Sequence, residues 1–168
     1  MTKAPHKVRV RDAAIDDVRT IVDFNCRLAL ESEDKALDPA VLTLGVERAL
    51  AQPAYCRYFM AEIGTEIVGQ TMITYEWSDW RNGVFWWIQS VYVAPRYRGG
   101  GVFRALHEYI TTLARAEPNV CGLRLYVDDE NHAAMATYRR LGLAPSGHHV
   151  YECDWSGHVT SAADKRTS

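Results

Sequence analysis

The 168-residue chain lacks the features that mark several specialised classes of protein. Its 19 Lys and Arg residues are outnumbered by 21 Asp and Glu residues, so there is no positive excess to hold a nucleic-acid backbone. No apolar run approaches the ~20 residues of a membrane span. The N-terminal residues also lack the apolar core of a signal peptide. We therefore expect a cytoplasmic protein that binds neither nucleic acid nor membrane.

Paired cysteine spacing and low-complexity stretches are absent as well. The four cysteines lie far apart, which favours thiols in a reducing compartment over a disulfide framework or a zinc site. We accordingly expect no metal. The chain shows no internal repeat and no interdomain linker, and its 48% hydrophobic content is enough for one substantial core. We interpret residues 1–156 as a single domain and residues 157–168 as a polar C-terminal tail.

The first half of the chain contains strand and helix patterns in alternation. Residues 8–11 alternate like a strand, and apolar residues then recur at helical spacing between 15 and 28. Asp38 and Pro39 are typical of a helix start, which predicts a second helix over roughly 39–51. Apolar runs then follow between turn residues near Gly64 and at Asn82-Gly83, which predicts a three-stranded antiparallel meander.

The second half has the pattern of a crossover between parallel strands. An amphipathic helix over 102–113 precedes a strand over 121–127, so this strand is expected to run parallel to the one over 84–93. A further helix ends at Gly142, and residues 148–155 alternate like a closing strand. The predicted fold is α/β (α+β), with a mixed, mostly antiparallel sheet of about six to seven strands flanked by about four helices.

Three consecutive glycines, Gly99–Gly101, join an apolar strand to the crossover helix. Such a turn exposes backbone N–H groups at a helix N-terminus, where the helix dipole also favours a phosphate. The neighbouring Arg96 and Arg98 would suit anionic groups. The alternative is a flexible surface turn, because short glycine motifs often occur without a ligand. The pattern fits neither a P-loop nor a dinucleotide-binding G-x-G-x-x-G motif.

Two motifs in the same order resemble those of the GCN5-related N-acetyltransferases (GNATs). The run "RGGGVF" is similar to their R/Q-x-x-G-x-G/A signature through Arg98 and Gly101, although Phe103 replaces the usual Gly or Ala. The run "NHAAMATYRRLGL" is similar to their N-x-x-A-x-x-x-Y-x-x-x-G-F segment, with Leu143 in place of the Phe. The resemblance covers residues from about 8 to 155.

The resemblance implies that acetyl-CoA binds in a V-shaped gap between the fourth and fifth strands. The fourth strand would pair with the pantetheine arm and the glycine turn would hold the pyrophosphate. The residues implied in cofactor binding are Val91, Tyr92, Val93, Arg98, Gly99, Gly100, Gly101, Val102, Phe103, Asn131, Ala134 and Tyr138. Asn131 has a second interpretation, because its side chain could instead cap its own helix.

The same resemblance implies direct attack of an amine on the thioester. The N–H near Val91 would stabilise the developing oxyanion, and Tyr138 would protonate the leaving thiolate, although Tyr138 could also be an ordinary half-buried helix residue. Glu76 is the candidate base or cation partner, with a solvated hairpin end as the alternative. The candidate acceptor-binding residues are Glu31, Glu33, Asp34, Glu76, Trp77 and Gln89.

These segments resemble the branch that contains diamine, polyamine and thialysine acetyltransferases. Gln89 and Ser90 stand where that branch tends to carry an acidic pair, and neither can accept an amine proton as a carboxylate does. The resemblance therefore implies a small-molecule amine as the partner, and possible homodimers. A protein or peptide N-acetyltransferase and a non-catalytic acyl-CoA sensor stay open as alternatives.

Overall fold

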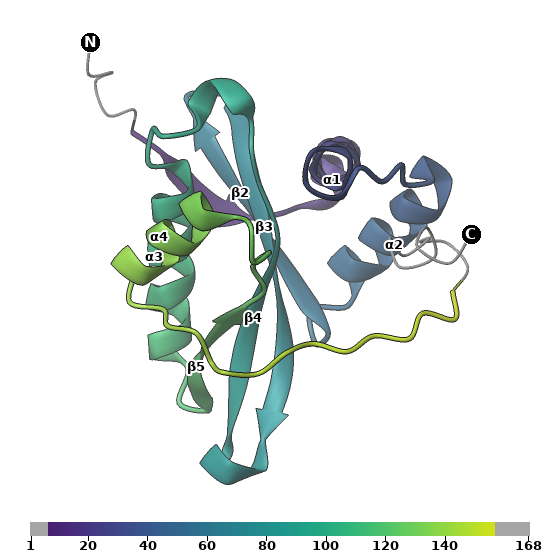
Figure 1. Ribbon diagram of the computed structural model, residues 1–168. Coiled ribbons are helices and arrows are strands. Elements are labelled where there is room, and N and C mark those ends of the chain that lie inside the picture. Colours follow the sequence, from purple (N-terminus) through teal and green to yellow (C-terminus); the bar gives the residue numbers. More distant parts are fainter. Residues whose placement is uncertain (1–6, 157–168) are drawn as a thin grey trace.

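The computed structural model describes residues 7–156, which form a five-stranded sheet with two helices on each side (Figure 1). The strands are β1 Arg9–Asp12, β2 Cys56–Ile63, β3 Glu66–Ser78, β4 Gly83–Val93 and β5 Val120–Leu125. The helices are α1 Val18–Glu33, α2 Pro39–Ala51, α3 Val102–Ala116 and α4 His132–Arg140. Short 3-10 turns lie at Ile15–Asp17, Asp79–Arg81 and Pro95–Tyr97.

The strand order is β1-β2-β3-β4-β5, antiparallel throughout except for the parallel pair β4 and β5. Local signals explain the joints between elements. Asp38 accepts a hydrogen bond from the Ala40 amide and Pro39 opens α2, while Asn82 takes a left-handed conformation between β3 and β4. The predicted α/β class, the antiparallel meander and the parallel crossover are therefore confirmed.

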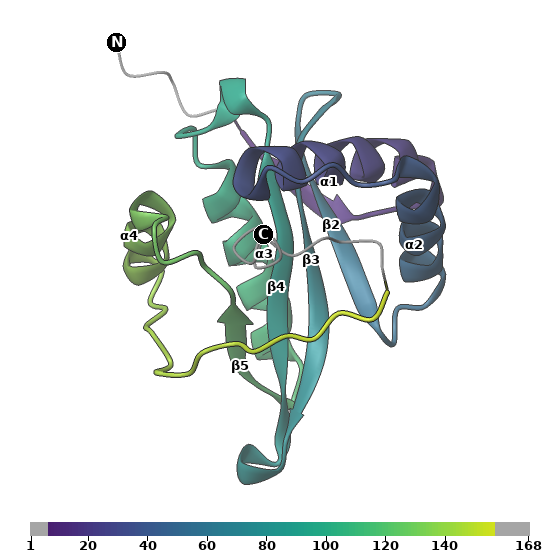
Figure 2. The same ribbon diagram turned by 45° about the vertical axis from the view of Figure 1, so that its right-hand side comes forward.

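The expected closing strand over 148–155 is wrong, so residues 7–156 contain five strands instead of six to seven. In this segment every residue is exposed, including Tyr151 at 95% and Trp155 at 90%. Because neither face of the segment is buried, nothing fixes a pairing register for it. The segment runs from α4 past β5 to the α1/α2 side of the sheet (Figure 2). The predicted tail over 157–168 lies outside the described residues.

Each face of the sheet carries its own apolar core. On the α3 side, Phe59, Trp86 and Ile88 pack against Leu106 and Ile110. On the α1/α2 side the cluster consists of Ile21, Val46, Tyr58 and Met60, with further apolar side chains around it. Burial of such a side chain contributes about 1.5–3 kcal/mol. The two cores hold the sheet rigidly between helix layers.

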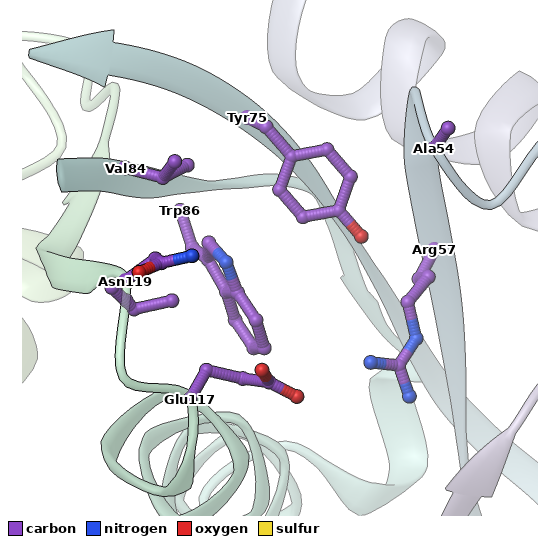
Figure 3. A pocket seen from close by; sticks show the side chains of 8 residues that line it. Ala54, Arg57, Tyr75, Val84, Trp86, Glu117 and Asn119 are labelled. Carbon is purple, nitrogen blue, oxygen red and sulfur yellow. The ribbon is translucent and has the colours of Figure 1, made fainter.

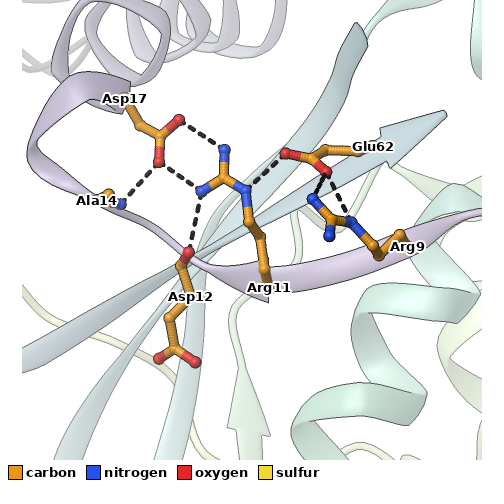
Figure 4. A network of polar contacts seen from close by, with 6 residues as sticks. All are labelled: Arg9, Arg11, Asp12, Ala14, Asp17 and Glu62. Carbon is orange, nitrogen blue, oxygen red and sulfur yellow. Dashed lines mark hydrogen bonds and ion pairs between the residues drawn. The ribbon is translucent and has the colours of Figure 1, made fainter. Parts of the chain in front are cut away.

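An ion-pair network fixes the outer edge of the sheet (Figure 4). The Glu62 carboxylate on β2 accepts hydrogen bonds from both Arg9 and Arg11 on β1. Arg11 also contacts both carboxylate oxygens of Asp17, at 2.7 and 2.9 Å, and the Ala14 amide donates to Asp17. The Arg11 guanidinium lowers the pKa of Asp17, which is 4% exposed. These contacts tie β1 to the start of α1.

Membrane-spanning helices, metal clusters and cysteines can be examined within the residues that the structure describes. Within residues 7–156 no helix is long and apolar enough to cross a membrane, and no three metal-ligating side chains gather in one place. The four cysteines, all inside this range, are free thiols.

Candidate active site

Strands β4 and β5 separate part of the way along the sheet. Their parallel pairing runs from Val84 opposite Val120 to Ile88 opposite Leu125. Beyond this point β4 continues to Val93, and within residues 7–156 its outer edge has no β5 partner. The unpaired backbone of 89–93 is therefore open to an extended ligand with amide groups of its own. This opening is the expected V-shaped gap.

A β-bulge lies at the point where the strands part. One β3 residue, Thr71, stands between the pairs Gln70–Tyr92 and Met72–Gln89, whereas β4 has two residues there, Ser90 and Val91. Ser90 has a φ of 49°, which is left-handed and uncommon for serine. Because the extra residue disrupts the ladder, backbone groups around Ser90 and Val91 are released from regular pairing. The predicted oxyanion donor, the N–H near Val91, belongs to this part of β4.

Buried polar side chains support the bulge from the α1 side. The Gln70 side chain is fully buried and donates from Nε2 to Asn25 Oδ1 at 2.8 Å. Asn25 in turn donates to the Tyr58 hydroxyl at 3.3 Å. The Thr71 hydroxyl donates to the Gln89 carbonyl at 3.1 Å. The sequence analysis missed this network, although a glutamine within an apolar strand pattern was a visible signal.

The glycine turn has a conformation that other residues adopt poorly. Gly99 and Gly101 have φ values of 73° and 86°, in the left-handed region. At Gly100 a Cβ would lie 3.0 Å from the Tyr97 carbonyl oxygen. The amides of Arg98 and Gly100 are used inside the turn, bonding to the Pro95 and Tyr97 carbonyls.

The first amides of α3 have no intrahelical partner, and they follow Gly101 directly. The donors left for an anion are therefore mainly those from Gly101 to Phe103. Together with the helix dipole and the absence of glycine side chains, these donors fit the diphosphate of CoA.

The Arg98 side chain folds back over the turn. Its Nε donates to the Val93 carbonyl at 2.8 Å, and its Nη2 forms an ion pair with Glu31 at the end of α1. Glu31 also accepts a hydrogen bond from the Tyr92 hydroxyl at 3.2 Å, and Arg98 lowers the pKa of Glu31. The structure therefore places Glu31, a predicted acceptor residue, beside the cofactor turn. Glu31 is not free to bind a cation.

Tyr138 on α4 lies beside Phe103 on α3, with ring centroids 5.5 Å apart and an edge-to-face angle of 67°. Burial raises the pKa of Tyr138. Phe103, which departs from the similar motif, thus packs against the proposed acid. Asn131 caps α4, because its Oδ1 accepts from the Ala134 amide at 3.1 Å. Its carbonyl oxygen is occupied by the capping role.

Glu76, the candidate base or cation partner, already has two hydrogen-bond partners within the chain. Its carboxylate accepts hydrogen bonds from Trp87 Nε1 and from Arg124 Nη1, the latter at 2.9 Å. The Trp87 N–H is the main cause that lowers the pKa of Glu76, followed by Arg124. Arg124 was not singled out by the sequence analysis, since its contact with Glu76 spans 48 residues.

The remaining predicted acceptor residues are not gathered in one place. Trp77 follows Glu76 on β3 and therefore projects from the opposite face of the sheet. Gln89 shares the face of Glu76 and donates to the Thr74 hydroxyl at 2.6 Å. Glu33 forms an ion pair with Lys35, and Asp34 ends α1 in a left-handed conformation. Only Glu76 and Gln89 lie on the same part of the sheet.

A cavity of about 420 Å³ lies at the other end of the sheet (Figure 3). Trp86 and Tyr75 form its wall, and Arg57 and Glu117 face each other across it. This is the end where β4 and β5 are still paired. The cavity contains none of the predicted site residues, so it is separate from the gap.

Comparison with known proteins agrees with the geometry. Residues 23–143 match the model of the acetyltransferase (GNAT) family. A possible acetyltransferase from Clostridium difficile 630 is 44% identical, with a TM-score of 0.81, and the match covers 88% of this chain and 97% of that one. No curated protein matches the chain.

More distant structures share the fold. A predicted acetyltransferase from Clostridium acetobutylicum, solved with acetyl-CoA, is 17% identical with a TM-score of 0.73 over 87% of this chain and 96% of that one. The glucosamine-6-phosphate N-acetyltransferase from Arabidopsis thaliana is 16% identical with a TM-score of 0.69 over 88% and 98%. The family match over most of the chain, joined to the gap, the bulge and the glycine turn, identifies the protein as an acetyl-CoA-dependent acetyltransferase of the GNAT family.

Proposed function

We propose that the protein acetylates the primary amine of a small molecule by direct attack on the thioester. When bound, acetyl-CoA supplies the activated acetyl group. The amine nitrogen forms a bond to the carbonyl carbon, and the carbon–sulfur bond breaks. The nitrogen loses one proton and the departing thiolate gains one, so the overall reaction needs no further reactant. The single observation that supports this proposal is the gap with a bulge at its apex.

The bulge supplies the electrostatic part of the reaction. The proposed oxyanion donor is the backbone N–H of Val91, next to the left-handed Ser90. One such fixed donor contributes roughly 3 kcal/mol to transition-state stabilisation. The buried Gln70 side chain supports this backbone, because its Nε2 donates to the Ser90 carbonyl at 3.5 Å and to Asn25 Oδ1 at 2.8 Å. The carbonyl oxygen is thereby bound by a donor that does not need to reorganise.

Tyr138 is the proposed proton donor to the leaving sulfur. A tyrosine hydroxyl carries its proton at neutral pH, as a general acid requires, and burial raises the pKa of Tyr138 further. The edge-to-face contact with Phe103 orients the ring from α3, the same helix whose N-terminus would hold the diphosphate. One helix therefore positions both the carrier and the residue that protonates its sulfur.

Glu76 has a weaker claim to be the general base. The Trp87 N–H and Arg124 hold its pKa below the ordinary range, so the carboxylate accepts a proton reluctantly. The same pairing weakens the case for a diamine or polyamine acceptor, which would need free negative charge on this face. Deprotonation of the amine by water that passes the proton to bulk solvent fits these contacts better.

Calorimetry and turnover together test the proposal. The chain is titrated with CoA and with acetyl-CoA, and thiol release is then followed with panels of small amines and of short peptides. Mass spectrometry identifies the acetylated product. We expect micromolar cofactor binding and turnover with small amines. Turnover restricted to peptides would overturn the choice of acceptor, and cofactor binding with no acceptor at all would contradict the transferase assignment.

A further inference from the structure

The two faces of the gap have different roles. The N-terminus of α3 and Tyr138 on α4 lie on one side of the sheet, so the cofactor approaches from that side (Figure 1). The acceptor must then reach the gap from the α1/α2 side. The side chains of Trp87 and Gln89 on β4 project there, next to Glu76 on β3 and Arg124 on β5.

Arg124 occupies the place where a cationic acceptor would be expected to bind. Its guanidinium lies 3.8 Å from the centre of the Phe85 ring and 5.7 Å from that of Trp87. Aromatic faces of this kind bind cations, and here the chain supplies the cation itself. The Trp87 ring is in turn stacked on Tyr126 at 4.4 Å. A second cation at this position would meet like charge.

In the ion pair of Glu76 and Arg124, it is Arg124 that has hydrogen-bond donors left for a ligand. Each carboxylate oxygen of Glu76 already accepts one hydrogen bond: Oε1 from Arg124 and Oε2 from the Trp87 indole. A guanidinium has five N–H donors, and within residues 7–156 only its Nη1 has a polar partner. The Arg124 side chain is 30% exposed, so its remaining donors can reach a ligand. The free donors match the planar oxygens of a carboxylate or phosphate.

The spacing along β4 limits the shape of the acceptor. Arg124 pairs with Trp87, and the bulge begins three residues further along, which corresponds to roughly 10 Å of strand. The reacting amine lies at the bulge and the anion lies at Arg124. The two groups must therefore stand at opposite ends of an extended molecule.

We propose that Arg124 is an acceptor-binding residue, and that the preferred acceptor is a primary amine carrying a carboxylate or phosphate far from the reacting nitrogen. This inference rests on the proposed function and narrows its substrate class. Tyr126, 55% exposed beside Trp87, would line the path between the two ends. The expected acceptors were a diamine, a polyamine or an amino acid-like amine, and of these the inference favours the amino acid-like class.

Matched acceptor pairs test the proposal on the intact chain. Lysine is compared with cadaverine, which lacks the carboxylate, and 6-aminohexyl phosphate is compared with 6-aminohexanol, which lacks the phosphate, so that the two kinds of anion are separated. Calorimetry on the CoA-bound chain measures acceptor binding directly, and kcat/KM gives a second readout. We expect the anionic member of at least one pair to bind roughly tenfold to a hundredfold more tightly.

Variants assign the preference to Arg124. Arg124→Gln should abolish the preference and leave CoA affinity unchanged, whereas Arg124→Lys should retain part of it. Arg81→Gln is the matched control, because Arg81 lies 5.1 Å over the same Phe85 ring but on the turn before β4. It should leave the preference unchanged. If Arg124→Gln fails to fold, the double variant with Glu76→Gln removes both charges and is measured instead.

Two results would overturn the inference. One is tighter binding of cadaverine and 6-aminohexanol than of their anionic partners, and the other is an anion preference that survives Arg124→Gln. Failure of the proposed function gives a different result, namely CoA binding with no amine acetylated. Acceptor binding by calorimetry would still decide the role of Arg124 in that case.

Discussion

Placing a negative charge at Gly101 should weaken CoA binding, and the structure allows the charge effect to be isolated. A Cβ at this position meets no atom within 4 Å, so a larger side chain does not clash. The φ of 86° strains any residue with a Cβ, by about 1–2 kcal/mol. Gly101→Asp and Gly101→Asn share this strain and nearly the same volume. Only the carboxylate distinguishes them.

The size of the charge effect follows from Coulomb's law. Two unit charges about 4 Å apart interact by about 1 kcal/mol in bulk water and about 4 kcal/mol near a protein surface. Gly101 is exposed at the start of α3, so the repulsion from a diphosphate falls within this range. We expect the Kd for CoA to be roughly fivefold to several hundredfold higher in Gly101→Asp than in Gly101→Asn.

Calorimetry at several salt concentrations measures this difference. The difference in Kd between the two variants should decrease as salt concentration rises, because the Debye length falls from about 10 Å at 0.1 M to about 3 Å at 1 M. Equal Kd values for the two variants at low salt would refute the reasoning. The diphosphate would then bind away from the glycine turn, and the open amides of α3 would have another purpose.

Three further predictions concern single side chains. Tyr138→Phe should lower kcat by about a hundredfold with little change in acetyl-CoA KM, and undiminished turnover would exclude the acid role. Glu76→Gln should lower the KM for anionic amines severalfold, because Arg124 loses its internal counter-charge; a raised KM would argue against Arg124. Asp17→Asn should lower the free energy of unfolding, measured in urea at pH 7, by about 1–3 kcal/mol. Asp12→Asn is the control, because the Asp12 side chain is half-exposed, and it should lower the same quantity by less than about 1 kcal/mol. Because the pKa of Asp17 is lowered, its contribution is full above about pH 4 and is lost as pH falls through the folded value, so the difference should narrow in acid.

Local signals in the sequence predicted the parts of the fold that depend on neighbouring residues. Asp38-Pro39 begins α2 and Asn82-Gly83 joins β3 to β4, as each pair's backbone preferences require. Gly99 and Gly101 are a further example of a local signal, because their left-handed backbone conformation favours glycine. These features were predictable because each needs only one residue type at one place in the chain.

Contacts between distant residues were not predictable in this way. Gln70 meets Asn25 across 45 residues, and Arg124 meets Glu76 across 48. Residues 148–155 alternate like a strand, yet alternation does not specify a partner, and no strand forms there. The separation of Trp77 from Glu76 is different. Adjacent residues on a regular strand face opposite sides, so the strand pattern itself already separated Trp77 from Glu76.

The division of the sheet into two faces explains why sequence motifs point to cofactor residues more readily than to acceptor residues. In the proposed complex the cofactor is held mainly by backbone, at a turn and a strand edge, and glycine spacing and strand patterns predict backbone conformation. The proposed acceptor site consists of side chains that three strands bring together, and its decisive group is Arg124 on β5, which forms an ion pair with Glu76 on β3. One substitution can therefore change the acceptor-binding side chains and leave the cofactor-binding backbone as it is. Arg124, and not the glycine turn, is therefore where this enzyme's specificity should be sought.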